Sequence, residues 1–168
     1  MKVLMISGDP KLLEPHTEAH ERFLLQCAAV DELRLVVWSP RAPFAVLGAL
    51  GAVLTTRFDV VTAQDPLWRG LLALVLARLG GAKLQIQVHQ NVDALLGINR
   101  AIFKAVVKRA DAIRAVSETI KAQVERAGAR VYVDVLPVFI DLEVLKRAPA
   151  ADLKKEFPQF GKTVFWIG

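Results

Sequence analysis

The sequence has little cysteine and no long apolar run, and both absences narrow what the protein can be. Cys27 is the one cysteine among 168 residues, so an internal disulfide and a cysteine-rich metal site are excluded. The longest apolar run, residues 44–54, contains two glycines and falls well short of the ~20 residues that a membrane span needs. The apolar stretch at residues 3–6 is too short for a signal peptide. We therefore expect a soluble, cytoplasmic protein, with contact at a membrane surface still open.

Several catalytic and binding motifs are also missing. No G-x-G-x-x-G turn follows the first apolar run, which disfavours a nicotinamide-dependent oxidoreductase, and no G-x-S-x-G elbow of a serine hydrolase is present. His16 and His20 have the i, i+4 spacing of metal ligands, but no third ligand lies near them in sequence, so we expect no metal site. The net charge of +5 is modest, and no nucleic-acid-binding motif accompanies it. Nucleic acid is therefore not an expected partner.

What the sequence does contain is a repeated alternation of short apolar runs and helical segments. The apolar runs predict strands over residues 3–6, 33–38, 60–63, 84–88, 112–116 and 131–135. The segments between them predict helices over about 15–29, 43–56, 65–80, 97–110 and 117–128. Strands joined by helical crossovers predict an α/β fold, in the form of a doubly wound, mostly parallel Rossmann-like sheet with helices on both faces.

Local signals mark the ends of these helices. Asp65 followed by Pro66 has the pattern of an N-cap and a first helical residue. Ser117 is predicted as the N-cap of a later helix. Gly80-Gly81 fits a left-handed helix end, and Gly128 is predicted to end a later helix.

The pattern breaks after residue 145. Residues 146–162 contain two prolines and a basic excess, which is typical of a linker, and an apolar strand is predicted over 163–167. We therefore expect a first domain over residues 1–145, a linker over 146–162, and the start of a second domain at 163–168.

Small polar clusters follow the predicted strands. In an open parallel sheet, ligands bind outside the carboxyl ends of the strands, so these clusters are candidates for a binding site. The candidates are Gly8, Asp9, Gln64, His89, Asn91 and Ser117. Local roles compete with binding for several of them, because Asp9 can cap a turn, Ser117 can cap a helix, and Asn91 can be an ordinary loop residue.

Four stretches together carry a resemblance to a known family. They are residues 58–66 (FDVVTAQDP), 87–89 (QVH), 110–118 (ADAIRAVSE) and 135–141 (VLPVFID). The chain resembles the N-terminal half of a group 1 glycosyltransferase, that is, glycosyltransferase family 4 with the GT-B architecture. Residues 163–168 (TVFWIG) resemble the opening strand of that family's second domain.

The resemblance implies transfer of a sugar from a nucleotide-sugar donor, with retention of configuration, to a glycan, a lipid-linked or a small-molecule acceptor. It implies no metal and no cofactor beyond the donor substrate. His89 would line the catalytic cleft, and the other candidates would bind substrate. Many members have a glycine-rich turn after the first strand, whereas this chain has only Gly8 there. The chain alone would be an inactive half of an enzyme. The alternative is a non-catalytic doubly wound domain that binds a ligand or partner. Oligomeric state stays open.

Basic residues recur on the helix predicted over 97–110. Arg100, Lys104 and Lys108 follow one another at intervals of four, and Arg109 lies beside them. A solvated helix face is the common outcome of this pattern. The sharper interpretation is attraction to an anionic membrane surface, at ~1 kcal/mol per basic residue, which would place the protein at the inner face of the membrane.

Overall fold

The computed structural model describes residues 1–38, 44–137, 155 and 159. The strands are β1 (Lys2–Ser7), β2 (Glu32–Val37), β3 (Val60–Ala63), β4 (Lys83–Val88), β5 (Ala112–Ala115) and β6 (Val133–Val135). The helices are the 3-10 helix η1 (Pro10–Leu13) and the α-helices α1 (Glu18–Ala28), α2 (Ala45–Thr55), α3 (Trp68–Gly80), α4 (Gly97–Val107) and α5 (Glu118–Arg126). The predicted domain boundary at 145 and strand over 163–167 lie outside the described residues, as does the predicted linker apart from Lys155 and Gln159.

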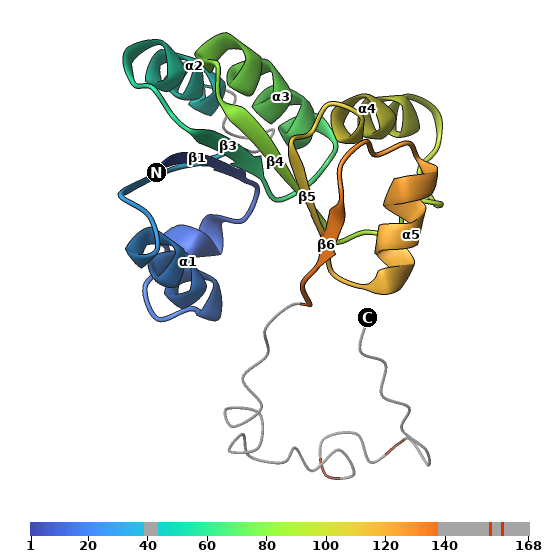
Figure 1. Ribbon diagram of the computed structural model, residues 1–168. Coiled ribbons are helices and arrows are strands. Elements are labelled where there is room, and N and C mark those ends of the chain that lie inside the picture. Colours follow the sequence, from blue (N-terminus) through green and yellow to red (C-terminus); the bar gives the residue numbers. More distant parts are fainter. Residues whose placement is uncertain (39–43, 138–154, 156–158, 160–168) are drawn as a thin grey trace. The chain divides into compact units, whose positions relative to one another are not determined.

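The six strands form one all-parallel sheet in the order β2-β1-β3-β4-β5-β6 (Figure 1). The chain moves from β1 to one side to form β2, and then crosses back over β1 to add β3 to β6 on the other side. The predicted doubly wound α/β fold is therefore confirmed. The strand order reverses between β1 and β3, and such a switch point is where ligands bind in this class of sheet.

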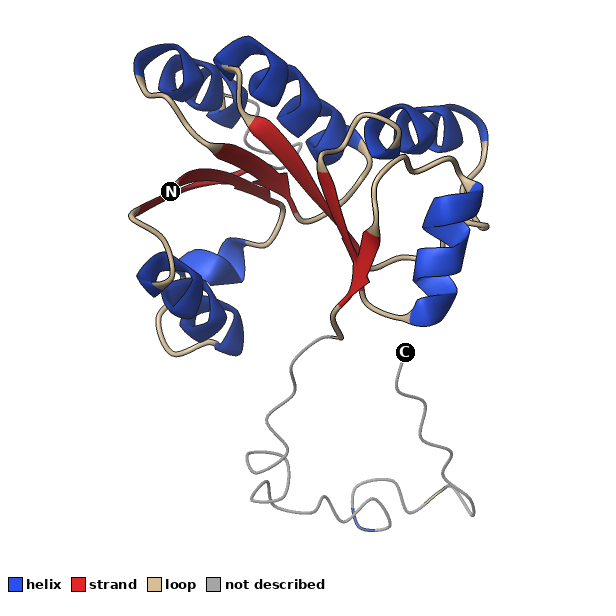
Figure 2. Cartoon of the chain, in the orientation of Figure 1, coloured by secondary structure: helices blue, strands red, loops and turns tan. Residues whose placement is uncertain are grey.

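The two faces of the sheet are covered unequally. Leu4 and Ile6 of β1 join buried residues of α2, α3, α4 and α5 in one large core. Met5 points the other way and packs with Leu12 and Ala19, which lie on the α1 side. Figure 2 shows α1 on one side of the sheet and α2 and α3 on the other. Because β1 is buried on both faces, apolar residues occupy nearly its whole length.

Within the described part of the chain, α1 and the short η1 are the helices on the second face, so β4 and β5 are open there. In β4, buried Leu84, Ile86 and Val88 alternate with the more exposed Lys83, Gln85 and Gln87, which is the pattern of a strand covered on one face. A groove of about 630 Å³ runs beside α1 over this open surface. Because Met1, Lys83 and Asp111 line it, the groove includes the amino ends of the strands, on the side away from the predicted site.

The predicted helix ends are partly confirmed. Ser117 is the N-cap of α5, where its hydroxyl accepts the N–H of Ile120 at 3.3 Å. Gly81 ends α3 with a left-handed φ of 66°, and Gly128 follows α5 with a φ of 99°. The predicted N-cap at Asp65 is wrong, because α3 begins three residues later at Trp68.

The physical reason for the late start of α3 is a competing turn. One carboxylate oxygen of Asp65 accepts the N–H of Leu67 at 2.9 Å, which is an Asx turn. The other oxygen of Asp65 pairs with Arg69 at 2.7 Å. One carboxylate oxygen is therefore used by the turn and the other by the Arg69 side chain, and Leu67 takes the cap position without a side-chain hydrogen bond.

The helix predicted over 97–110 ends earlier, at Val107. Lys108 is its C-cap, and the Arg109 guanidinium donates to the carbonyl of Ala105 at 3.1 Å. Because Arg109 satisfies an open carbonyl of the last turn, it helps to end the helix. Of the helices in the described residues, none has the length and apolar character to cross a membrane.

Candidate functional site

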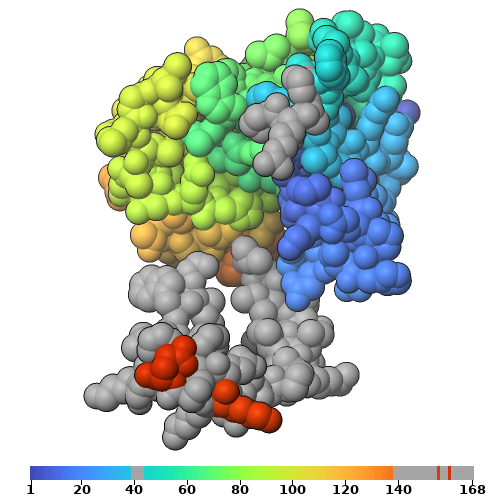
Figure 3. All heavy atoms as spheres, turned by 180° about the vertical axis from the view of Figure 1, so that it is seen from behind, coloured from blue at the N-terminus to red at the C-terminus, as the bar shows by residue number. Residues whose placement is uncertain are grey.

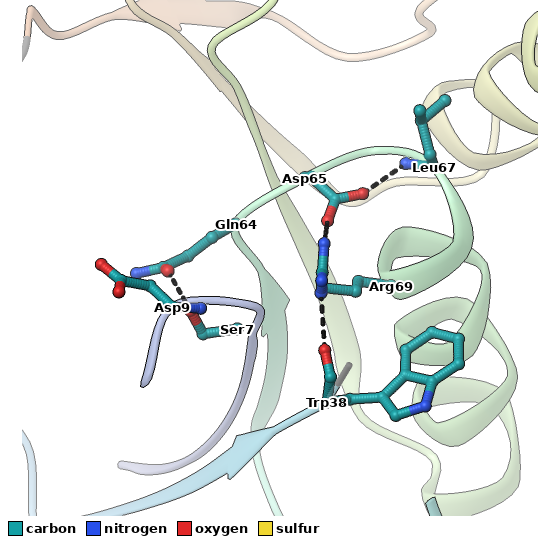
Figure 4. A network of polar contacts seen from close by, with 7 residues as sticks. All are labelled: Ser7, Asp9, Trp38, Gln64, Asp65, Leu67 and Arg69. Carbon is teal, nitrogen blue, oxygen red and sulfur yellow. Dashed lines mark hydrogen bonds and ion pairs between the residues drawn. The ribbon is translucent and has the colours of Figure 1, made fainter. Parts of the chain in front are cut away.

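Polar residues converge at the switch point between β1 and β3. Ser7, at the end of β1, donates its hydroxyl hydrogen bond to the amide oxygen of Gln64, which directly follows β3 (Figure 4). The backbone N–H of Asp9 donates to the Ser7 hydroxyl oxygen at 3.1 Å. The structure therefore brings together Gly8, Asp9 and Gln64, three of the candidates predicted from the sequence.

Asp9 also has the local role that the sequence allowed. Its carboxylate accepts the N–H of Lys11 at 3.0 Å, and it is the N-cap of η1. The side chain is thereby held beside the switch point.

Arg69 is a residue of this site that sequence reasoning missed. Its guanidinium donates to Asp65 at 2.7 Å and to the carbonyl of Trp38, at the end of β2, at 2.9 Å (Figure 4). The guanidinium lies so close to Gly8 that a Cβ added there would be 2.2 Å from its central carbon. Gly8 does not have a positive φ. Its lack of a side chain is therefore needed to make room for Arg69.

His89 directly follows β4, the next strand along the edge, and is solvent-exposed. Crowding by the surrounding chain desolvates the charged imidazolium, and the positive charge of Arg114 adds to this effect, so both lower the pKa of His89. The imidazole is therefore neutral at pH 7, where one ring nitrogen donates a hydrogen bond and the other accepts one.

Arg114 is the second residue that sequence reasoning missed. It lies on β5, and its guanidinium donates to the carbonyls of Leu136 at 2.9 and 3.1 Å and of Pro137 at 3.1 Å. A weaker bond of 3.4 Å joins it to the amide oxygen of Gln87 on β4. Partial burial lowers the pKa of Arg114 without removing its charge at neutral pH. A charged residue inside a short apolar strand was the signal that could have revealed it.

Asn91 and Ser117 lie further along the same edge and have local roles. The Asn91 side-chain oxygen accepts the N–H of Asp93 at 3.1 Å, and Ser117 caps α5. Within the part of the chain that the structure describes, neither side chain is hydrogen-bonded to Gln64 or His89. The candidates thus line one edge in strand order, with a connected network only at β1 and β3.

The remaining candidates lie away from this edge. Arg100, Lys104, Lys108 and Arg109 are all exposed, although only the first two are within α4. His20 contacts the carbonyl of Leu12 through Nδ1 at 2.8 Å. The described residues contain no group of three histidine, cysteine or acidic side chains arranged to hold a metal ion.

A doubly wound parallel sheet with a polar network at its switch point is characteristic of the Rossmann-like class of α/β domains. The model of Glycosyltransferase Family 4 matches residues 7–144 of the sequence. The chain therefore belongs to glycosyltransferase family 4.

Solved structures share this fold. One crystal structure of Anabaena HepE in complex with UDP matches with a TM-score of 0.56 and 15% identity, over 95% of this chain and 50% of that chain. A second, in complex with UDP and glucose, matches with a TM-score of 0.59 and 16% identity over the same shares. The chain thus spans about half the length of these structures. No curated protein matches it.

Proposed function

We propose that this domain is the acceptor-side half of a retaining glycosyltransferase. It would receive a glycan, a lipid-linked or a small-molecule acceptor, and a second domain would supply the nucleotide-sugar donor. Membership of glycosyltransferase family 4 supports the reaction class. The position of the polar network at the switch point supports the place of the site. The HepE structures, both of which contain UDP and one of which also contains glucose, support a nucleotide sugar as the donor.

The observation that carries the proposal is the position of His89 directly after β4, at the carboxyl edge of the sheet. A neutral imidazole can donate a hydrogen bond to a sugar hydroxyl, and can accept one, without bringing charge into the cleft. We assign to His89 the positioning of the donor sugar or the acceptor, a role that does not require it to remove a proton. Such positioning across a closing cleft supplies a large part of the rate in transfer reactions.

Gly8, Asp9 and Gln64 would form the part of the site at β1 and β3. The guanidinium of Arg69 fills the space that a side chain at Gly8 would take, and it is paired with Asp65. Arg69 would therefore hold the turn that borders the substrate. Asn91 and Ser117 would border the acceptor side.

The exposed basic residues of α4 and the turn after it support a peripheral location at the cytoplasmic face of the inner membrane. Arg100, Lys104, Lys108 and Arg109 would each contribute ~1 kcal/mol of attraction near an anionic surface.

The test is sugar transfer by the longest form of the protein that its gene encodes. The reaction is followed by mass spectrometry with a panel of UDP-sugars and candidate acceptors. We expect His89→Ala to lower kcat by at least about a hundredfold, with the fold intact by circular dichroism. The control is His16→Asn, which removes an exposed imidazole elsewhere and suits the positive φ of that position; it should leave the rate unchanged.

Two results would contradict the proposal in different ways. Unchanged transfer by His89→Ala would remove His89 from the site while leaving the reaction class in place. Binding of a nucleotide sugar without any transfer in the unaltered protein would favour the alternative, a doubly wound domain that binds its ligand without catalysis.

A further inference from the structure

A small pocket with a basic rim lies between α4, α5 and the loop after β4. Its volume is about 190 Å³. The buried side chains of Val92 and Phe103 line it, as do the cations Arg100, Lys104 and Arg126. In Figure 3 the yellow-green surface of α4 adjoins the orange surface of α5. Two of the basic residues that the sequence singled out on α4 thus share a concave site with a third from α5.

Gln123, on α5, gives this pocket a hydrogen-bond donor. The side chain is 7% exposed, and its amide oxygen accepts the N–H of Val92 at 2.8 Å. This bond fixes the orientation of the amide, since the oxygen faces Val92 and the nitrogen must face the other way. The structure records no hydrogen-bond partner for that nitrogen among the described residues, and Gln123 lines the pocket. An N–H donor that lines the pocket and has no protein partner is available to a ligand acceptor.

The pocket keeps most of its positive charge, because the one carboxylate that lines it is only weakly paired. Asp93 pairs with Arg126 at 2.9 Å, but the two side chains are 59% and 62% exposed. Exposed pairs of this kind contribute only ~0–1 kcal/mol, so Arg126 can rotate toward a stronger anion at little cost. Three cations and one carboxylate give the pocket a formal charge of about +2.

We propose that this pocket binds a terminal phosphate group. A phosphomonoester carries close to two negative charges and three acceptor oxygens, which matches the charge of the rim and the free amide nitrogen of Gln123. Guanidinium groups are well suited to phosphate geometry, and Arg100 and Arg126 supply two of them. The apolar surface of Val92 and Phe103 accepts the carbon chain next to the phosphate. The inference does not depend on sugar transfer, because the pocket lies among the helices, away from the polar network at β1 and β3.

The first test is a titration of the 168-residue chain with inorganic phosphate at constant ionic strength, with chloride as the reference anion. The side-chain amide signals of Gln123 in 1H–15N NMR spectra report on the base of the pocket. We expect phosphate, and not chloride, to shift these signals with saturation. No saturable shift would overturn the proposal.

Two lysines of the same helical run form a matched pair of variants. Lys104 lines the pocket, and Lys108, four residues later, does not. We expect Lys104→Ala to raise the Kd for phosphate roughly tenfold, and Lys108→Ala to change it less than about twofold. Equal effects would indicate diffuse attraction to the basic surface and would also overturn the proposal.

A third variant isolates the donor at the base. Gln123→Glu keeps an oxygen to accept the Val92 N–H but replaces the amide nitrogen by a charged oxygen, so it should abolish phosphate binding. The NMR spectrum shows whether this variant is folded, and the lysine pair decides the matter if it is not.

Vesicles distinguish the two sources of a terminal phosphate. Phosphatidylcholine vesicles contain either phosphatidic acid, which ends in a phosphomonoester, or phosphatidylglycerol, which does not, at matched surface charge. A preference for phosphatidic acid that is lost in Gln123→Glu and kept in Lys108→Ala would identify a lipid headgroup. Saturable phosphate binding without this preference would support the pocket and identify a soluble phosphorylated compound.

Discussion

Replacing Gly8 by alanine tests whether the packing of Arg69 determines the residue at this turn. A Cβ at position 8 would lie 2.2 Å from the central carbon of the guanidinium and 2.6 Å from Nε, which is closer than atoms can approach. The guanidinium therefore has to move, and it then loses its hydrogen bonds to Asp65 and to the Trp38 carbonyl. The backbone at Gly8 is not left-handed, so the alanine itself adds no conformational strain.

The expected magnitude follows from these two bonds. The paired side chains are 29% and 23% exposed, and hydrogen bonds to charged groups contribute ~1.5–3 kcal/mol each in mutational data. Partial rehydration of the displaced guanidinium reduces the loss, and the lower entropy of the unfolded chain returns ~0.4–1 kcal/mol. We expect Gly8→Ala to lower the free energy of unfolding by about 2 kcal/mol.

A double-mutant cycle isolates the contact with Arg69. In the Arg69→Ala background the added Cβ meets no guanidinium, so Gly8→Ala should be neutral or slightly stabilising there. The coupling energy between the two positions should therefore be ~2–3 kcal/mol. The matched control is Gly48→Ala in α2, where a Cβ meets nothing within 4 Å; it should stabilise the protein by ~0.5–1 kcal/mol.

Urea unfolding followed by tryptophan fluorescence measures these free energies, and Trp38 lies next to the displaced group. The comparison holds only if all variants unfold in a two-state manner with the same m-value. If Gly8→Ala costs the same in both backgrounds, the guanidinium is not the reason for glycine, and the reasoning from the contact is refuted.

Three further predictions concern the same edge of the sheet. Arg114→Gln should raise the pKa of His89, because it removes a neighbouring positive charge, but leave it below the ordinary 6.5, because desolvation is the larger cause; an NMR titration that shows no change would contradict this. Because the pKa of His89 is lower in the folded state than in the unfolded state, the unfolded state binds the proton at a higher pH. The free energy of unfolding should therefore decrease as the pH falls below about 6.5. In urea unfolding, His89→Gln should remove this contribution to the pH dependence. Ser117→Ala should cost ~1 kcal/mol through loss of the α5 cap, whereas Thr119→Ala, at an exposed position of the same helix, should cost less than about 0.5 kcal/mol.

The fold was predictable because a short apolar run in the sequence marks the position of each strand. All six predicted strands are present, and they form the predicted parallel sheet. The error at Asp65 shows where local patterns stop being sufficient. Asp-Pro favours a helix start, but the same carboxylate also satisfies an Asx turn and an ion pair with Arg69. Which arrangement prevails depends on Trp38, whose carbonyl holds Arg69 in place although it lies 31 positions from Arg69 in the sequence.

The unequal cover of the two sheet faces was visible in the sequence, although only in part. The run at β1 is apolar throughout, and β1 is buried on both faces. In β4, polar Lys83, Gln85 and Gln87 alternate with apolar residues, which is typical of a strand with one open face. The polar members find partners across the sheet, since the amide oxygen of Gln85 accepts the Thr62 hydroxyl and that of Gln87 accepts from Arg114.

The positions of the candidate residues at the carboxyl edge of the sheet were predictable, but the contacts that they make were not. Because ligands bind at the carboxyl ends of parallel strands, the polar residues after each strand were candidates. Arg69 was not predictable, because its contact with Gly8 requires β3 to lie next to β1, and the sequence does not specify strand order. The contacts of Arg114 with the carbonyls after β6 were not predictable for the same reason, because they depend on which strand lies next to β5.

The two missed arginines differ in what they contribute to the edge of the sheet. The charge of Arg69 is balanced by Asp65 at 2.7 Å, so this residue mainly fixes the turn at Gly8. The partners that the structure describes for Arg114 are neutral carbonyls and an amide, so its charge is not neutralised by them. This positive charge is felt by His89, whose pKa it helps to lower after desolvation as the larger cause. A neutral hydrogen-bonding group beside a cation is suited to a substrate that develops negative charge as it reacts. We therefore propose that Arg114, which sequence analysis had not selected, acts together with His89 on the chemistry at this edge.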